Sequence, residues 1–203
     1  MPKKIAIMTT ENVRNIESII NYFKDKDVNL TCLTDNVNSP VLEKAKSLGI
    51  AYKYLPPEQN TQYLASQNFD LIVLSHYKSA LGKDTLKIGK FINIHSSLLP
   101  SFKGTDEINR AYLAGVKVSG VTIHWETGDI DGGKIIAQYP VLIGNTTHID
   151  EFTQDIYNIE DKLYPPVIEA IVEDKVFDFQ DLFQNSCQHN SSGCGGNCQN
   201  CNG

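Results

Sequence analysis

The chain has 203 residues, 41% of them hydrophobic, which is enough to bury the core of one domain. Its formal net charge of −6 argues against a partner such as DNA or tRNA, and no apolar run approaches the roughly 20 residues that cross a bilayer. The N-terminus has no long apolar stretch of the kind found in secretion signals, and only Cys32 precedes the cysteines of the last seventeen residues. We therefore expect a cytoplasmic protein, a monomer or homodimer, that binds small molecules rather than nucleic acid or membranes.

The first half of the chain alternates short β-rich apolar runs with amphipathic stretches. One helix is expected over residues 15–23. A second follows Ser39, which can cap it, with Pro40 in its first position and Gly49 at its end. This alternation predicts a parallel sheet with helices packed against it. The expected strands are 4–8, 28–33, 51–55, 70–75 and 91–95.

The pattern changes in the second half. Residues 105–115 predict a helix with Thr105 as its N-cap. Two longer strands are expected at 119–127 and 134–143, joined by the turn-rich sequence GDIDGG. The fold class is therefore α/β, with a doubly wound, mostly parallel, Rossmann-like sheet that ends in a strand pair and a long helix.

The long helix is expected over residues 149–172, where Pro165 and Pro166 should start a new helix or impose a kink. No apolar periodicity follows near the C-terminus. We expect residues 1–180 to form the folded domain and residues 181–203 to be a flexible, Cys-rich tail.

The predicted strand FINIH carries polar side chains on one face. Because strand side chains alternate, Phe91, Asn93 and His95 point to one side, and Ile92 and Ile94 point to the other. Burying Asn93 without hydrogen bonds would cost on the order of 1–3 kcal/mol. Ligands of open parallel sheets bind beyond the carboxyl ends of the strands, so these polar groups emerge where such a fold places its chemistry.

Two sequence blocks carry a specific resemblance. NIHSSLLPSFKG, followed by GVTIHWETGDIDGGKIIAQ, closely resembles the folate-dependent formyltransferases, above all the glycinamide ribonucleotide formyltransferases. NIH alone would be a weak signal, whereas Asn-x-His-x-Ser-Leu-Leu-Pro with a later Asp-Gly-Gly loop is specific. The likeness extends more weakly over residues 3–172 and includes IEDKLYP in the late helix. It implies a formyltransferase catalytic domain over residues 1–180, with 10-formyltetrahydrofolate as co-substrate and no metal in the catalytic site.

The resemblance implies that Asn93, His95 and Asp131 are catalytic. The Asn93 amide and a protonated His95 can donate to the oxyanion of a tetrahedral intermediate, and Asp131 can move a proton directly or through water. From the residues alone, Asn93 and His95 are equally well explained as buried polar groups with internal partners, and Asp131 as a turn residue. His124 matches a family histidine and is interpreted as structural, with orientation of His95 as a secondary role.

The resemblance also implies that backbone groups of two loops bind the folate. The sequence SHYKSAL departs from the usual apolar-plus-arginine pattern, although backbone recognition tolerates a change of side chain. Phe91 is a candidate for the apolar pterin slot. Both Phe91 and Tyr77 are also explained simply as core aromatic residues. The predicted loop residues are Lys78, Ser79, Ala80 and Leu81, and Thr127, Gly128, Asp129 and Ile130.

The acceptor half of the site departs from the family. The resemblance implies a glycine-rich loop after the first strand whose N–H groups hold a phosphate, but Glu11 and Val13 stand at its two glycine positions. Thr10 or Arg14 can compensate, since arginine suits phosphate geometry. Arg14 is equally well explained as a solvated helix residue. The predicted acceptor-binding residues are Thr10, Arg14, Asn15 and Glu160.

We expect the acceptor to be glycinamide ribonucleotide or a related phosphorylated amine, in purine and one-carbon metabolism. The alternatives are a different acceptor, such as an amino-sugar nucleotide, and a non-catalytic folate- or metal-binding relative. Four cysteines near His189 can hold zinc or an iron–sulfur cluster, or else are redox-labile thiols without a metal. These cysteines are Cys187, Cys194, Cys198 and Cys201.

Overall fold

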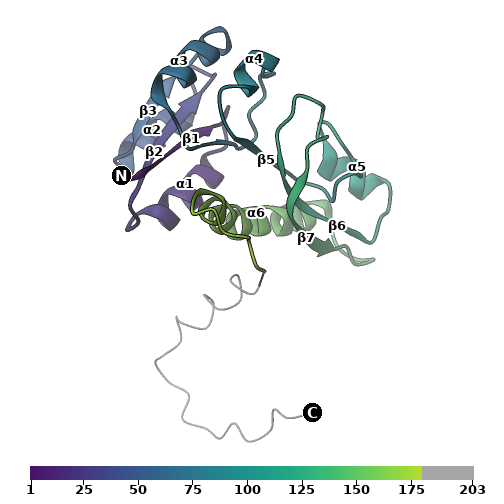
Figure 1. Cartoon of the computed structure of the whole chain (residues 1–203). Helices are drawn as coiled ribbons and strands as arrows, with labels where there is room; N and C mark the ends of the chain where they lie inside the picture. The colour runs from purple at the N-terminus through teal and green to yellow at the C-terminus, as the bar shows by residue number, and fades with distance from the viewer. Residues whose placement is uncertain (180–203) are drawn as a thin grey trace, which may run out of the picture.

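Seven strands form one sheet in the order β3-β2-β1-β4-β5-β6-β7 (Figure 1). The structure, a computed structural model, describes residues 1–179. Strands β1 to β5 run parallel, whereas β6 pairs antiparallel with both β5 and β7. The predicted mostly parallel sheet with a C-terminal strand pair is thereby confirmed. The strands are β1 (Lys3–Met8), β2 (Val28–Thr34), β3 (Ala51–Tyr54), β4 (Leu71–Leu74), β5 (Phe91–His95), β6 (Val118–Trp125) and β7 (Ile135–Leu142).

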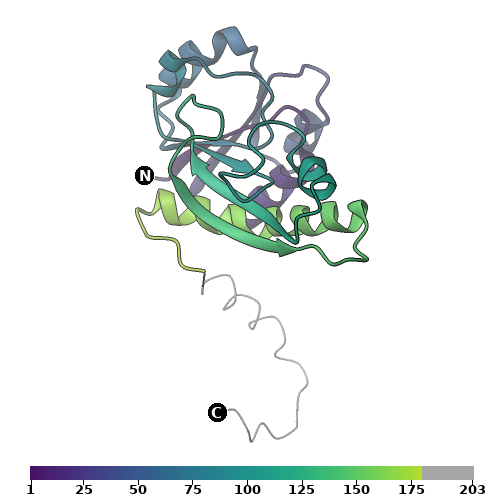
Figure 2. The same cartoon turned by 90° about the vertical axis from the view of Figure 1, so that its right-hand side faces the viewer.

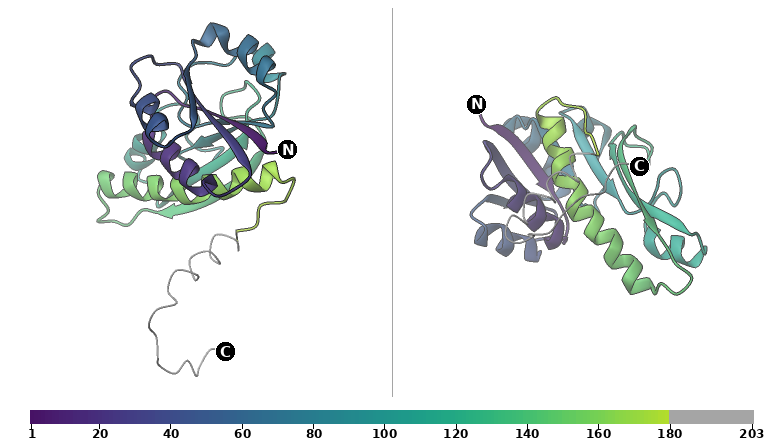
Figure 3. Two further views of the ribbon diagram at one scale, coloured as in Figure 1. Left: turned by 90° about the vertical axis from the view of Figure 1, so that its left-hand side faces the viewer. Right: turned by 90° about the horizontal axis from the view of Figure 1, so that it is seen from below.

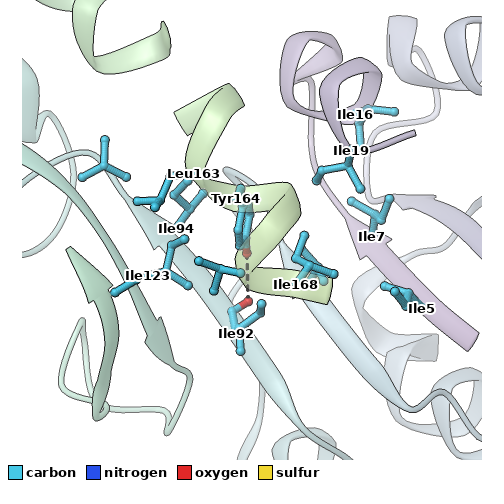
Figure 4. Packing of buried hydrophobic residues seen from close by; sticks show 14 of the residues in the cluster. Ile5, Ile7, Ile16, Ile19, Ile92, Ile94, Ile123, Leu163, Tyr164 and Ile168 are labelled. Carbon is cyan, nitrogen blue, oxygen red and sulfur yellow. Dashed lines mark hydrogen bonds between the residues drawn. The ribbon is translucent and has the colours of Figure 1, made fainter. Parts of the chain in front are cut away.

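Helices α1 (Val13–Phe23) and α6 (Ile149–Val172) pack against each other and cover one face of the sheet (Figure 3). Ile5, Ile7 and Ile92 point from the strands into the core beneath them and are fully buried (Figure 4). Each such isoleucine contributes about 1.5–3 kcal/mol by leaving water. Helix α6 also lies along β6 and β7, so it joins the parallel and antiparallel parts of the sheet (Figure 2).

The other face carries α3 (Asn60–Gln67), which follows a 3-10 turn at Pro57–Gln59, and the short α4 (Lys83–Leu86). Met8 and Phe91 point to this face and pack in a second core, as strand alternation predicts. The sequence analysis did not identify α3 or α4. The apolar periodicity of α3 is weak, and α4 is a single turn.

Helix α2 (Pro40–Ser47) forms as predicted. The side-chain oxygen of Ser39 accepts a hydrogen bond from the N–H of Val41, and Pro40 takes the first position. Gly49 follows the helix with a φ of +73°, the left-handed conformation for which glycine is suited.

Helix α5 (Glu107–Leu113) corrects one prediction, because Asp106 rather than Thr105 is its N-cap. The side chain of Asp106 does not cap the helix. It accepts a hydrogen bond from Nδ2 of Asn109 over 2.6 Å, within a left-handed turn at φ +62°. The preceding turn, rather than a capping side chain, therefore determines where this helix begins.

Helix α6 is continuous over 24 residues and contains both Pro165 and Pro166, so the expectation of a new helix at this point is wrong. Each proline removes one backbone hydrogen bond. Tertiary packing compensates: Tyr164 is fully buried, and its hydroxyl donates to the carbonyl oxygen of Leu74 at 2.7 Å. The same hydroxyl is 3.4 Å from the carbonyl oxygen of Ile92 (Figure 4).

Candidate active site

The structure brings together the three predicted catalytic side chains, although they come from distant segments. Asn93 and His95 lie on β5, and Asp131 lies in the loop between β6 and β7. Nδ1 of His95 is 3.6 Å from Oδ2 of Asp131, and only 6% and 10% of these side chains are exposed. In the antiparallel β5–β6 pair, β6 ends beside the start of β5, and the loop that follows β6 runs back toward the end of β5, where Asp131 lies 3.6 Å from His95.

Both ring nitrogens of His95 face acceptor oxygens. Nε2 donates to the carbonyl oxygen of Phe102 over 3.1 Å, and Nδ1 faces Asp131. The 3.6 Å separation from Asp131 is longer than a hydrogen bond. Nδ1 is therefore not held by Asp131 and can contact a ligand placed beside it, and catalytic hydrogen bonds commonly tighten only when substrate binds.

His124 is part of the same group of side chains. It is fully buried, and its Nε2 is 3.4 Å from Nδ2 of Asn93 and 3.6 Å from Oδ1 of Asp131. Its Nδ1 lies 3.0 Å from the carbonyl oxygen of Trp125. The ring thus contacts Asn93 and Asp131. The sequence analysis interpreted His124 as structural, with orientation of His95 as a secondary role, and that secondary role stays a prediction.

The surroundings of Asp131 favour its ionised form. Burial alone would raise the pKa of Asp131, but the nearby imidazole of His124, a hydrogen bond from the N–H of Gly104 and the imidazole of His95 lower it. The Gly104 N–H donates to Oδ2 over 2.7 Å. Asp131 also has a φ of +46°, a backbone conformation that is uncommon for residues other than glycine and that clusters at functional sites.

The two predicted folate loops border the second core. Leu81 and Leu86 pack against this core, and a Cβ atom on Gly128 would lie 3.2 Å from Cδ1 of Leu86. The loop after β6 therefore runs close to the segment after β4. Phe91 is only 2% exposed, so it supports this region from the core and offers almost no surface to a ligand.

Several polar groups of these loops already have protein partners. The carboxylate of Glu126 accepts hydrogen bonds from the N–H groups of Thr127 and Gly128, which leaves their carbonyl oxygens for a ligand. The N–H of Lys78 donates to Oγ1 of Thr10, and Oγ of Ser79 donates to Asp35. The remaining predicted loop residues are Ala80, Leu81, Asp129 and Ile130, of which Ile130 is 75% exposed.

On the acceptor side, Arg14 lies between two carboxylates. Its guanidinium pairs with Glu160 and Asp161, each at 2.5 Å, and stacks over the ring of Tyr157 at 4.3 Å. Arg14 is only partly exposed, so the structure does not support its interpretation as a solvated helix residue. Glu160 is fully buried and also accepts hydrogen bonds from Ser96 and His76.

Residues 11–15, next to this ion pair, form a network of side chains where the resemblance implies a glycine-rich loop. Asn15 is fully buried and bonds Asp161, and it accepts a hydrogen bond from Ser75 at the end of β4. Asn12 caps α1 through the N–H of Asn15. Glu11 points to Lys78, at 3.3 Å. Asn15 therefore lies beside the ion pair of Arg14 and Asp161, and its binding of the acceptor stays a prediction. The sequence analysis did not identify His76, whose one signal was its place directly after the predicted buried strand 70–75.

Among residues 1–179, no group of three or more His, Cys, Asp or Glu side chains is arranged to hold a metal ion. Cys32 is fully buried, as expected of a strand residue, and its burial raises the pKa of the thiol to about 12. The cysteines proposed for zinc or an iron–sulfur cluster lie outside the described residues. Residues 1–179 contain no helix that is long and apolar enough to cross a membrane. The predicted cysteine ligands are Cys187, Cys194, Cys198 and Cys201.

Comparisons with known proteins agree with this site. Phosphoribosylglycinamide formyltransferase of Bacillus subtilis is 31% identical over 185 residues, which cover 84% of this chain and 95% of that protein. Formyltetrahydrofolate deformylase 2 of Arabidopsis thaliana is 30% identical, with 87% of this chain matched to 58% of its length. The chain thus spans almost all of the first relative and just over half of the second.

Solved structures show the same fold. Phosphoribosylglycinamide formyltransferase from Anaplasma phagocytophilum superposes with a TM-score of 0.81 at 28% identity, covering 89% of this chain and 92% of that one. The enzyme of the same name from Bacillus halodurans gives a TM-score of 0.77 at 32% identity, with 84% and 95% covered. Residues 3–168 match the family described as formyl transferase. The chain therefore belongs to the formyl transferase family.

Proposed function

We propose that this formyl transferase moves the formyl group of 10-formyltetrahydrofolate to the amine of glycinamide ribonucleotide or a related phosphorylated amine. The observation that carries the proposal is the meeting of Asn93, His95 and Asp131 at the end of β5, with His95 and Asp131 3.6 Å apart. The relatives named phosphoribosylglycinamide formyltransferase, matched over nearly their whole length, support this acceptor. The scarcity of cysteine before residue 187 supports a reducing, cytoplasmic setting.

The proposed reaction needs charge stabilisation and proton transfer. The acceptor amine attacks the formyl carbon, a C–N bond forms, and the carbonyl oxygen becomes an oxyanion. The Asn93 amide and the Nδ1–H of His95 stabilise that oxyanion by hydrogen bonds. The bond from N10 of the folate to the formyl carbon then breaks. Asp131 accepts the proton that the amine loses, and N10 gains one, directly from Asp131 or through water.

The test is release of tetrahydrofolate by the purified chain with 10-formyltetrahydrofolate and glycinamide ribonucleotide. We expect turnover that depends on both substrates and yields the formylated ribonucleotide. If a folate analogue binds but the ribonucleotide is not formylated, the acceptor assignment is wrong.

A different acceptor is the second candidate, because Glu11 and Val13 occupy the positions where the family resemblance predicts phosphate-binding glycines. The same assay with an amino-sugar nucleotide as acceptor distinguishes the two. Tetrahydrofolate release without any amine would instead indicate hydrolysis. The direct roles of Thr10, Arg14, Asn15 and Glu160, and the domain boundary near residue 180, stay predictions.

A further inference from the structure

A buried carboxylate lies beneath two partly exposed cationic side chains at the acceptor end of the site. Oε2 of Glu160 is 2.5 Å from the guanidinium of Arg14 and 3.2 Å from Nε2 of His76. The Glu160 side chain has no exposed surface, whereas 27% of Arg14 and 30% of His76 are exposed. A ligand that approaches from solvent therefore meets the two cations before the anion that holds them.

The environment of His76 favours its protonated form. Burial alone would lower the pKa of His76, but its hydrogen bond and charge interaction with Glu160 raise it, with a further contribution from Glu107 on α5. Arg14, the other charged neighbour, opposes this rise. Nε2 is engaged by Glu160, while Nδ1 has no hydrogen-bond partner among residues 1–179.

The backbone also points to a functional role for His76. The residue has a φ of +51° two positions after the end of β4, a conformation that few residues other than glycine adopt. Ser96, which follows the catalytic His95, donates to Oε1 of Glu160 over 2.6 Å. The cationic pair is therefore tied to the strand end where the acceptor amine would react.

We propose that Glu160 is a positioning residue that holds Arg14 and protonated His76 as a pair of cations for the anionic group of the acceptor. The proposal rests on the proposed function. In it, the side chains of Arg14 and His76 bind the anion, in place of the backbone N–H groups of the glycine-rich loop that the resemblance implies. Asp161 partly offsets the charge of Arg14. The carboxylate of Asp161 is shared, because it also accepts a hydrogen bond from the Asn15 amide. The N-terminus of α1, where Arg14 lies in the first turn, adds a favourable field for an anion.

The kinetic test compares acceptor KM and kcat for the full chain and two variants, His76→Asn and Glu160→Gln. Losing a hydrogen bond to a charged group should raise the acceptor KM about tenfold in His76→Asn, and by more in Glu160→Gln, with kcat within about threefold of wild type. Glu169→Gln is the matched control, because this α6 carboxylate pairs with Lys26 and Tyr22 away from the site. Unchanged KM in both variants would overturn the proposal.

The pH profile separates positioning from a merely structural role. In wild type, acceptor KM should rise as pH rises through the pKa of His76, because the cation is lost. In His76→Asn this pH dependence should disappear. His76 is partly exposed, so this variant keeps the test valid if Glu160→Gln does not fold, and an unchanged pH profile would contradict the proposal.

A binding measurement separates this proposal from the choice of acceptor. Inorganic phosphate added to the full chain should shift the imidazole NMR signals of His76 and raise its pKa, and both effects should be lost in Arg14→Ala. If phosphate produces these effects but glycinamide ribonucleotide is not formylated, the acceptor assignment fails and the cation pair stands. If the ribonucleotide is formylated and phosphate leaves His76 unchanged, the cation pair fails and the proposed function stands.

Discussion

At the scale of single residues, Asp131 is the group on which the proposed proton transfer depends. Asp131→Asn keeps the size of the side chain but cannot accept a proton from the amine. We expect kcat to fall about 10²–10⁴-fold, the usual contribution of a positioned acid–base group. The measurement is the steady-state rate of tetrahydrofolate release, together with the affinity for a folate analogue, which should change little.

Asp25→Asn is the matched control for this variant, because Asp25 is exposed in the turn between α1 and β2. It should retain wild-type kcat. If Asp131→Asn retained a kcat within threefold of wild type, Asp131 would have no part in the proton transfer.

His124 offers a second test at this scale, through the pKa of its neighbour. The His124 imidazole, whose Nε2 is 3.6 Å from Asp131, lowers the pKa of that carboxyl, so His124→Asn should raise the pKa of Asp131. Asp131 must be ionised to accept a proton, so the acidic limb of the kcat profile should move to higher pH. Misplacement of the loop should also lower the maximal kcat, by about tenfold to a hundredfold.

His148 is the control position for this variant. It is exposed just before α6, and its side chain does not cap that helix. His148→Asn should leave the profile where it is in wild type. An acidic limb that does not move in His124→Asn would show that the interaction between His124 and Asp131 has no effect on catalysis.

At the scale of elements, the loop between β6 and β7 depends on a close backbone approach. A Cβ atom on Gly133 would lie 1.6 Å from the carbonyl oxygen of Trp125, so any side chain there must displace one of the two segments. The N–H of Trp125 donates to the carbonyl oxygen of Lys134 at the same point, over 3.0 Å. Gly133 thus closes the loop that carries Asp131.

We therefore predict that Gly133→Ala lowers kcat at least tenfold by moving Asp131 away from His95, since a displacement of about 1 Å can cost 10²-fold in rate. Folate-analogue binding should weaken as well, because residues 127–130 belong to the same loop. In the control Gly89→Ala the added methyl group would meet Cδ1 of Ile72 at an ordinary 3.6 Å. If Gly133→Ala has wild-type kcat, the loop tolerates the shift and its closure is not critical.

The elements also show which information is local in the sequence. Strand alternation in FINIH placed Phe91 on one face and Ile92 on the other, because side-chain direction follows from the strand itself. The cap at Ser39 was likewise a local signal. Thr105 failed as a cap because the preceding turn sets the backbone there, and Pro165 did not end α6 because the buried packing of Tyr164 outweighs the lost hydrogen bonds.

In the candidate site, too, the residues were identified from local motifs, whereas their contacts depend on the fold. Asn93 and His95 were identified from one motif and Asp131 from another, but their contact depends on the antiparallel pairing of β5 with β6, which is not a local property. The pairing of Arg14 with Glu160 joins residues 146 positions apart. Only the folded sheet and the course of α6 bring His76 to this pair.

At the scale of the whole molecule, Glu160 links four elements, because its carboxylate bonds residues after β4 and β5 and on α1 from its own place on α6. Burial alone would raise its pKa, but His76, Ser96 and Arg14 lower it from 4.5 to about 2. The unfolded chain therefore binds a proton at Glu160 at a higher pH than the folded chain does.

This difference predicts how stability depends on pH. The contribution of Glu160 is fully present above about pH 5 and is lost as pH falls toward about 2, and it amounts to roughly 3 kcal/mol. The difference in unfolding free energy between wild type and Glu160→Gln, measured by urea denaturation, should shrink over that range. Glu17→Gln, which removes a surface pair with Lys44, should differ from wild type by less than about 1 kcal/mol. A wild-type advantage over Glu160→Gln that persists unchanged at pH 2.5 would mean that the Glu160 carboxylate does not stabilise the fold by its charge.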